Sequence, residues 1–328
     1  MSIYVVTGGA GFIGSHLATR IGQAGHEVRV LDSLEGAASR GRADALASVP
    51  HVEIIQGDIC DEALCRRVLA GAEFVLHHAG EASVQRSLDD MAGCAAVNIG
   101  GTINLLEAAR AAGTVRRFVF ASSCAVYGDT PGAAKHEASL TDPLSPYASS
   151  KLSAEYFCRN FFRLYGLQTV SLRYFNVYGP GQDPAGDYAS VIPKFVTAIT
   201  RGATPVLYGD GEQSRDFIYV DDIVEANLCA VRATRGVGGR VVNIGSGQST
   251  SLRQVLQTLG QVLGHGVEAE HCPMRPGDIK HSRADIAVAA GLLQFTPSVG
   301  LRDGLARTLN WYQGESGIAE GNVAESPI

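Results

Sequence analysis

A serine, a tyrosine and a lysine form the combination of residue types with the clearest chemical use. Tyr147 and Lys151 stand four residues apart in the stretch YASSK. In a helix this spacing places both side chains on one face, where the ammonium would favour the phenolate and lower its pKa from about 10. Ser123 follows the apolar run 118–122 and offers a hydroxyl that can share the proton or hold a substrate oxygen. The three residues predict proton transfer at a substrate hydroxyl, with Tyr147 as the base.

A glycine-rich turn near the N-terminus gives this pattern a context. Gly8, Gly11 and Gly14 lie in TGGAGFIGSHL, between an apolar run and a helical pattern. Glycine permits the tight turn, the approach of backbone N–H groups to a pyrophosphate, and close helix packing. Asp32 ends the next apolar run, 18 residues after Gly14, where a carboxylate can accept both ribose hydroxyls of NAD and repel the 2′-phosphate of NADP. We therefore predict NAD binding; the alternative is a turn that is tight only for packing.

Further cofactor contacts are expected where other strands end. Phe12 and Ile13 belong to the glycine turn, Ile59 follows the apolar run 52–56, and Ala79 follows the run 74–77. Asp58 has two interpretations of similar weight. Its carboxylate either contacts the adenine or caps the helix that follows.

The elements that must position these residues alternate along the first half of the chain. The expected strands are nearly continuous β-branched runs, which is typical of a parallel sheet buried on both faces: residues 3–6, 28–31, 52–56, 74–77, 118–122 and 170–174. Helical patterns fall between them, at 14–24, 61–69, 92–112 and 147–165. This alternation predicts an α/β fold with a doubly wound parallel (Rossmann) sheet in residues 1–178.

The pattern changes after residue 178. The loop sequence GPGQDP is followed by shorter elements. We expect helices at 192–200, 223–233, 252–263 and 301–312, and strands at 206–208, 217–220 and 241–245. Residues 179–328 are therefore predicted to form mainly a smaller C-terminal α/β lobe for the substrate, with some segments crossing back to the first domain.

Composition narrows the functional classes. The 328 residues carry 27 Lys and Arg against 33 Asp and Glu, a net charge of −6 that argues against general nucleic-acid binding. There is no run of about 18 apolar residues, so no membrane span is expected. The seven cysteines are scattered and none forms a CxxC pair, which favours reduced thiols in a cytoplasmic protein and no metal site.

Motifs throughout the chain resemble the extended short-chain dehydrogenase/reductase family, in its nucleotide-sugar 4-epimerase branch. The similar stretches are TGGAGFIGSHL, SSCAVYGD, SPYASSK, RYFNVYGP, GDGEQSRDFIYVDD and RPGDIKHSRAD. The resemblance implies that NAD is the cofactor and that Ser123, Tyr147 and Lys151 are catalytic, the last two also contacting NAD. It further implies a UDP-sugar substrate in the C-terminal lobe, and a homodimer formed through residues 92–112 and 147–165.

Departures from related branches favour one reaction. Ala125 stands where the family's dehydratases and decarboxylases carry an acidic residue, and alanine cannot supply the additional acid–base group those reactions need. Asn176 resembles the hexose epimerases, whereas UDP-glucuronate 4-epimerases tend to have threonine there and an arginine soon after the Gly-Pro. In this chain GQDP follows instead, and Asp183 would repel a substrate carboxylate.

We therefore expect a 4-epimerase of UDP-GlcNAc/UDP-GalNAc and/or UDP-Glc/UDP-Gal. The alternatives are a UDP-glucuronate 4-epimerase or another NAD-dependent nucleotide-sugar oxidoreductase. A non-catalytic NAD-binding regulator would be expected to have lost the Ser123, Tyr147 and Lys151 set, which is intact.

The resemblance also assigns substrate contacts in the second half. Asn176 binds the substrate, and Ser190 and Val191 lie near the nucleotide. Tyr208 stacks on uracil. The remaining positions would serve the diphosphate, the ribose and the sugar, and are Arg215, Arg275, Asp278 and Ser282.

Ser282 matches a position that is tyrosine in epimerases confined to UDP-glucose and UDP-galactose. A small side chain there would leave room for a 2-acetamido group. The alternative is that Ser282 lines the site and selects nothing.

Overall fold

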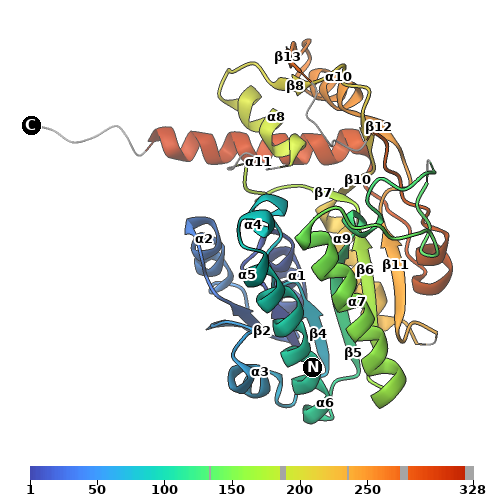
Figure 1. The fold of residues 1–328 in the computed structure, drawn as a ribbon. Helices are drawn as coiled ribbons and strands as arrows, with labels where there is room; N and C mark the ends of the chain where they lie inside the picture. Colours follow the sequence, from blue (N-terminus) through green and yellow to red (C-terminus); the bar gives the residue numbers. More distant parts are fainter. Residues whose placement is uncertain (133, 185–189, 235, 274–279, 322–328) are drawn as a thin grey trace, which may run out of the picture.

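The computed structural model describes residues 1–132, 134–184, 190–234, 236–273 and 280–321, and for 315–321 only the helical backbone. Its centre is a seven-stranded sheet in which all neighbouring strands are parallel (Figure 1). In spatial order the strands are β11 (Arg240–Ile244), β6 (Thr169–Tyr174), β5 (Arg117–Ser123), β4 (Phe74–His77), β1 (Ile3–Thr7), β2 (Glu27–Asp32) and β3 (Val52–Gln56). The predicted α/β doubly wound sheet is confirmed.

Helices cover both faces of this sheet, as Figure 1 shows. Alternate strand residues enter opposite layers: Val6 and Val119 pack with one set of helices, and Val5 and Phe118 with the other. The first layer contains α1 (Phe12–Gln23), α2 (Ala37–Leu46) and α9 (Val220–Arg232), and the second α3 (Glu62–Leu69), α6 (Thr102–Ala112) and α7 (Pro146–Tyr165). The strands are apolar on both sides because both layers bury them.

Helix α7 begins and ends at residues suited to those positions. The Ser145 hydroxyl accepts a hydrogen bond from the Ala148 N–H at 3.2 Å, and Pro146 takes the first helical position. Proline loses nothing there, because that N–H would have no helical partner. Gly166 closes the helix in the left-handed conformation. The helix therefore starts one residue before Tyr147.

Three helical regions differ from the sequence prediction. The expected helix at 92–112 is divided into α5 (Met91–Ala95), a π-helical turn (Ala96–Gly101) and α6. A Cβ on Gly101 would lie 2.4 Å from the Ile59 side chain, so this turn packs closely against Ile59. Helices α2 and α4 (Val84–Asp89) were not predicted, because they show little apolar periodicity.

A second group of elements follows β7 (Asn176–Tyr178), which pairs with β10 (Phe217–Tyr219). It has its own apolar core and lies above the sheet in Figure 1. Its helices are α8 (Val191–Thr200), α10 (Leu252–Leu263) and α11 (Leu301–Gly321), and its short strands are β8 (Val206–Tyr208), β9 (Ser214–Arg215), β12 (Thr250–Ser251) and β13 (Glu270–Cys272). A 3₁₀ turn covers Cys124–Tyr127 and a π-helical turn Ala289–Leu293.

Two elements beyond residue 178 belong to the sheet layers. β11 pairs with β6, and α9 packs against α1 and the sheet. The division of the chain at residue 178 stays a prediction. In the described part of the chain, no helix is long and apolar enough to cross a membrane.

Candidate active site

The glycine turn joins β1 to α1 and leaves no space for side chains. Gly8 has a φ of +65°, and a Cβ there would lie 2.5 Å from the Ala79 nitrogen. A Cβ on Gly14 would lie 2.2 Å from the Gly8 carbonyl oxygen, and one on Gly11 would lie 2.9 Å from it. Real Cβ atoms do not approach so closely, so this turn requires glycine at these positions for its own packing.

The start of α1 also suits an anion. Gly11 precedes the helix, and among the described residues no side chain caps it and no acidic residue stands in its first turn. The first N–H groups of a helix have no partner within the helix and carry partial positive charge. A pyrophosphate is the group that such a glycine-lined helix start binds in dinucleotide folds.

Asp32 lies beside this turn, at the end of β2. One carboxylate oxygen accepts from the Ala10 N–H at 3.0 Å, and the other accepts from the Leu34 N–H at 2.9 Å. Each oxygen retains a lone pair for a further donor, such as a ribose hydroxyl. Asp32 is therefore placed where a carboxylate could bind the ribose hydroxyls of NAD.

The other predicted cofactor residues lie around the same sheet edge. Asp61, not Asp58, caps α3, since its carboxylate accepts from the Leu64 N–H at 2.9 Å. The exposed Asp58 side chain accepts from the Cys60 N–H at 2.8 Å. Ile59 is buried, and the Ala79 N–H donates to the Thr7 hydroxyl at 3.3 Å. Phe12 and Ile13 open α1, both half-buried.

Ser123, Tyr147 and Lys151 come together where β5 and α7 meet. Ser123 is the last residue of β5, and its hydroxyl is a hydrogen-bond partner of the Tyr147 phenol. The Lys151 ammonium lies 5.9 Å from the centre of the Tyr147 ring and donates to the Ala121 carbonyl at 3.1 Å. The predicted helical face and the strand-end serine are both present.

Burial dominates the ionisation of the tyrosine and the lysine. Burial raises the pKa of Tyr147 to about 12, and the hydrogen bond with Ser123 only partly opposes this. Burial also lowers the pKa of Lys151 to about 8. In the protein alone, desolvation therefore favours the neutral phenol. The lowering of the tyrosine pKa by Lys151, to which a bound nicotinamide cation would add, stays a prediction.

Asn98 is a site residue that the sequence analysis missed. It lies in the π-helical turn and is 3% exposed. Its amide accepts from the Glu81 N–H at 2.7 Å and donates to the Glu81 carbonyl at 3.0 Å and to the Ser150 hydroxyl at 2.9 Å. It thereby holds the Gly80 backbone beside Lys151. A polar residue within an apolar helical pattern was the available signal.

A buried ion pair beneath the site was also missed. Arg173 on β6 donates two hydrogen bonds, of 2.8 and 2.7 Å, to the Glu155 carboxylate on α7. The Ser122 hydroxyl donates to the same carboxylate at 2.5 Å. Ser122 precedes Ser123, and Glu155 lies one helical turn after Lys151. This network fixes α7 against the strand that carries Ser123.

His77, the last residue of β4, has a structural role. His77 is hydrogen-bonded through both ring nitrogens, to the Thr7 hydroxyl at 2.7 Å and the Thr102 hydroxyl at 2.9 Å. Burial lowers its pKa well below the usual range, so the ring is neutral. Within the described ranges, no group of three or more His, Cys, Asp or Glu residues could hold a metal ion.

Asn176 on β7 and Ser282 in the second lobe lie on segments that the backbone around Asp216 connects. The Asn176 backbone and side-chain N–H groups both donate to the Asp216 carbonyl, at 2.9 and 3.1 Å. The Ser282 N–H donates to the Ser214 carbonyl at 3.1 Å. Asp216 itself is fully buried, and its carboxylate accepts four hydrogen bonds from Ser246, Gly247 and Ala284. One buried aspartate thus joins these segments.

The remaining substrate positions are more widely spread. Ser190 and Val191 lie at the start of α8, and Tyr208 ends β8. Arg215 lies on β9, and its guanidinium donates to the Ser214 carbonyl at 3.0 Å. The predicted residues Arg275 and Asp278 lie outside the described residues.

Comparisons with known proteins agree with this geometry. The model of the NAD-dependent epimerase/dehydratase family matches residues 4–245. The UDP-glucose 4-epimerase of Mycolicibacterium smegmatis is 39% identical over 317 residues, which cover 95% of this chain and 99% of that protein.

Solved structures give the same result. A UDP-N-acetylglucosamine 4-epimerase from Methanobrevibacter ruminantium, in complex with UDP-N-acetylmuramic acid, superposes with a TM-score of 0.90 at 36% identity, covering 96% of this chain and 99% of that one. The UDP-glucuronic acid 4-epimerase of Bacillus cereus, in complex with UDP-glucuronic acid and NAD, has a TM-score of 0.87 at 31% identity, with 95% and 99% covered.

Proposed function

The chain belongs to the NAD-dependent epimerase/dehydratase family, and we propose that it is a 4-epimerase of a UDP-hexose. The observation that carries this proposal is the arrangement of Ser123, Tyr147 and Lys151 at the edge of a nucleotide-binding sheet. Ala125 next to this set supplies no further acid or base. The residues present therefore suffice to move one proton at a hydroxyl, and do not suffice for elimination of water.

In the proposed mechanism, Tyr147 takes the proton from the 4-hydroxyl of the sugar. Ser123 shares this proton through its hydrogen bond with the phenol. NAD, when bound, supplies the hydride acceptor and donor and a positive ring charge that favours the phenolate. The transient 4-keto sugar then turns over, so that its opposite face would receive the hydride and C4 would be inverted. Tyr147 returns the proton to O4. Lys151 supplies positive charge within 5.9 Å of the phenol ring.

The cofactor is held by the residues already described at the sheet edge. The start of α1, with Gly8, Gly11 and Gly14, would take the pyrophosphate, and Asp32 the ribose. We retain Phe12, Ile13, Asp58, Ile59 and Ala79 as further contacts, and Tyr147 and Lys151 as contacts to the nicotinamide side.

We propose that the substrate lies between Asn176 and the second lobe. The M. smegmatis relative is named for UDP-glucose and the M. ruminantium structure for UDP-N-acetylglucosamine, which supports a UDP-hexose. We assign the other contacts as expected from the sequence: Ser190, Val191, Tyr208, Arg215, Arg275, Asp278 and Ser282. The half-buried Ser282 is small enough to leave room for a 2-acetamido group.

UDP-glucuronate is the second candidate, because the B. cereus enzyme is also similar. The loop after β7 disfavours it. Gly181 and Asp183 stand where an arginine would bind a substrate carboxylate, and the nearby Arg42 donates to the Gly181 carbonyl instead.

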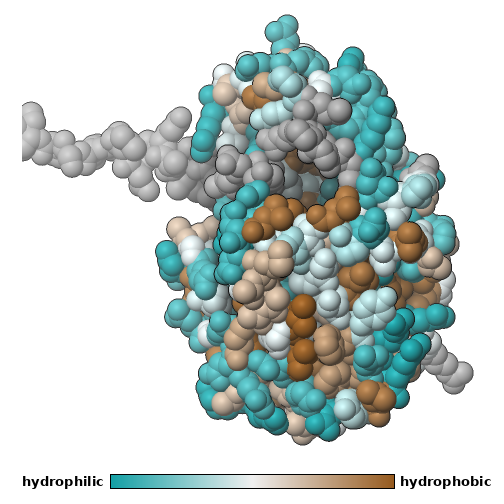
Figure 2. All heavy atoms as spheres, in the orientation of Figure 1, coloured by the Kyte–Doolittle hydropathy of each residue, from teal (hydrophilic) through white to brown (hydrophobic). Residues whose placement is uncertain are grey.

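We further propose a homodimer, formed through residues 92–112 and 147–165. Figure 2 shows apolar residues gathered over α5, α6 and α7. α7 carries two exposed large apolar side chains, Tyr156 and Leu164, at 47% and 70% exposure. All seven cysteines are free thiols, which supports a cytoplasmic location.

Proton NMR tests the activity directly. The purified protein is incubated with UDP-GlcNAc, UDP-Glc or UDP-glucuronate, without added reductant. Inversion at C4 of the first or second sugar is expected, with no net change in NAD. Inversion of UDP-glucuronate alone, or net reduction of a sugar, would contradict the proposal.

A further inference from the structure

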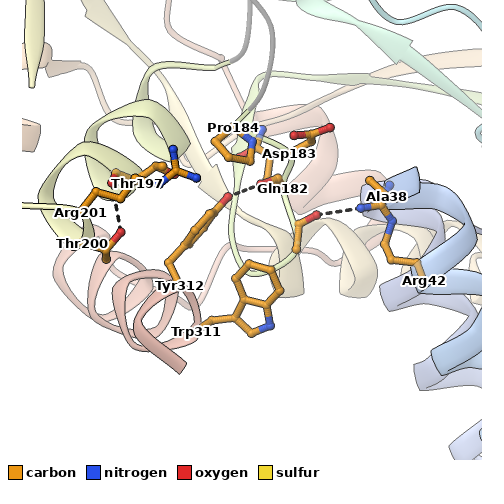
Figure 3. Close-up of a pocket in the computed structure, with 11 residues that line it drawn as sticks. Ala38, Arg42, Gln182, Asp183, Pro184, Thr197, Thr200, Arg201, Trp311 and Tyr312 are labelled. Carbon is orange, nitrogen blue, oxygen red and sulfur yellow. Dashed lines mark hydrogen bonds between the residues drawn. The ribbon is translucent and has the colours of Figure 1, made fainter. Parts of the chain in front are cut away.

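The loop after β7 lies between the two parts of the molecule and lines a cavity of about 290 Å³ (Figure 3). Two consecutive carbonyls of this loop accept hydrogen bonds from opposite sides. Arg42 of α2 donates to the Gly181 carbonyl at 3.1 Å, and the Tyr312 hydroxyl of α11 donates to the Gln182 carbonyl. The loop is therefore held by a helix of the cofactor domain and by the last helix of the chain.

Arg42 also reaches the glycine turn. Its Nε donates to the Ala10 carbonyl at 2.7 Å, while the Ala10 N–H donates to Asp32 at 3.0 Å. Burial lowers the pKa of the half-buried guanidinium, and the carboxylates of Asp183 and Asp32 oppose this by stabilising its charge. One side chain thus joins the peptide next to the ribose carboxylate to the loop at Gly181.

The loop is in turn connected to the substrate segments. The Gln182 side chain donates to the Val177 carbonyl at 3.1 Å and to the Ser190 hydroxyl at 3.2 Å. Val177 follows Asn176 on β7, and Ser190 precedes α8. Hydrogen bonds and the intervening backbone at Ala10 and Gly181–Gln182 therefore connect Asp32 through Arg42 to both substrate segments.

We propose that Arg42 is a positioning residue that couples occupation of the dinucleotide site to the affinity of the UDP-sugar site. The coupling rests on the proposed function, since it needs both ligands. A bound dinucleotide would fix the position of the Ala10 peptide, and through it the Arg42 side chain. Arg42 would then fix the Gly181 carbonyl, so that the neighbouring Gln182 holds Ser190 in place. Arginine suits this task because its planar fork can serve two carbonyls at once.

Binding measurements test the coupling without turnover. Calorimetry gives the Kd of UDP for the full chain with and without NAD, and the Kd of NAD itself. Trp311 is the single tryptophan and lines the same cavity, so its fluorescence reports on the loop. In the wild type, NAD should tighten UDP binding. In Arg42→Met, this tightening should be lost, with about tenfold weaker UDP binding to the NAD-loaded protein.

Tyr312→Phe keeps the hydrogen bonds of Arg42 to Ala10 and Gly181 and removes the hydroxyl that donates to the Gln182 carbonyl. It should weaken UDP binding about fivefold and leave the Kd of NAD unchanged. Arg42→Lys should lose the coupling as Arg42→Met does, because a single ammonium cannot donate to the Ala10 and Gly181 carbonyls with the geometry of a guanidinium. Arg201→Met is the matched control: Arg201 lines the same cavity, and within the described ranges its side chain has no hydrogen bond or ion pair, so no change is expected.

The outcomes separate the coupling from the proposed function. If Arg42→Met and Tyr312→Phe retain the wild-type ratio of UDP affinities with and without NAD, the coupling is overturned and the epimerase assignment stands. Equal effects of Arg201→Met and Arg42→Met would also overturn it. If the wild type binds NAD but no UDP, the proposed function fails, and the coupling with it.

Discussion

Tyr147 and Lys151 are both buried, and burial disfavours the charged form of each. It raises the pKa of the phenol to about 12 and lowers that of the ammonium to about 8. The two shifts move the proton affinities of these groups apart, because burial favours the neutral phenol and the neutral amine. Ser123 favours the phenolate by hydrogen bonding. Positive charge added beside the phenol would lower its pKa further and allow Tyr147 to act as a base.

Tyr147→Phe tests the role of the phenol. Removing a positioned base typically lowers the rate by about 10²- to 10⁴-fold, while the ring that packs in the site remains. Turnover of the UDP-sugar is measured by NMR, and NAD content by absorbance after denaturation. NAD content should be unchanged. Near-normal turnover in this variant would eliminate Tyr147 as the base.

Lys151→Met should stabilise the protein while inactivating it. The pKa of Lys151 falls from 10.5 to about 8 on folding, and each unit corresponds to about 1.4 kcal/mol. Burial of the cation therefore lowers the free energy of unfolding by on the order of 3 kcal/mol. In the variant the Ala121 carbonyl loses its hydrogen-bond donor, which offsets part of the gain. We expect the free energy of unfolding at pH 7 to rise by about 1–2 kcal/mol.

The pH dependence has a definite sign. The Lys151 amine holds its proton more tightly in the unfolded chain than in the folded protein. The loss of stability from burying this charge is therefore complete below pH 8 and disappears as pH rises toward 10.5. The advantage of Lys151→Met should shrink over that window. Denaturant unfolding at pH 7 and 9.5 measures it, and an advantage that grows with pH would show that Lys151 is not a buried cation.

At the scale of elements, the turn between β1 and α1 depends on glycine. Gly14→Ala would place a Cβ 2.2 Å from the Gly8 carbonyl, so the backbone of the turn must shift. Loss of NAD binding by at least about tenfold is expected, since the N–H groups at the start of α1 would move. Equilibrium dialysis with NAD measures this loss.

Gly41→Ala is the matched control, because Gly41 lies in α2 with open space around its Cβ position. It should bind NAD normally, and it should be stabilised by up to about 1 kcal/mol, as alanine is the better helix former. Normal NAD binding by Gly14→Ala would mean that the turn tolerates the shift and that its glycines serve packing alone.

The elements differ in how far sequence alone could predict them. The core strands are continuous apolar runs, and Tyr147 and Lys151 keep their helical spacing, so local pattern was sufficient. The π-helical turn with Asn98 was not predictable in this way, because the contact of Gly101 with Ile59 joins residues 42 positions apart in the chain. The contacts of Arg42 were equally hidden: its partners, Ala10 and Gly181, lie 32 and 139 residues away in the chain.

On the scale of the whole molecule, the proposed chemistry and the proposed selection of substrate belong to different parts. The catalytic residues lie on β5 and α7, and Ser282 lies in the C-terminal half. The Ser282 N–H is bonded to Ser214, two residues before the Asp216 carbonyl that holds Asn176. A change at residue 282 therefore alters the wall of the proposed sugar site and leaves Tyr147 and Lys151 in place.

Ser282→Tyr tests this separation. Overfilling a packed site costs about 1–3 kcal/mol, or roughly a 5- to 150-fold loss in rate. The loss should fall on UDP-N-acetylhexosamines and largely spare UDP-glucose and UDP-galactose, whose 2-hydroxyl is small. Both kinds of substrate use the same catalytic residues, so the ratio of their kcat/KM values cancels any damage to the chemistry. An equal loss for both would show that Ser282 does not select the substrate, and that selection depends on residues elsewhere in the second lobe.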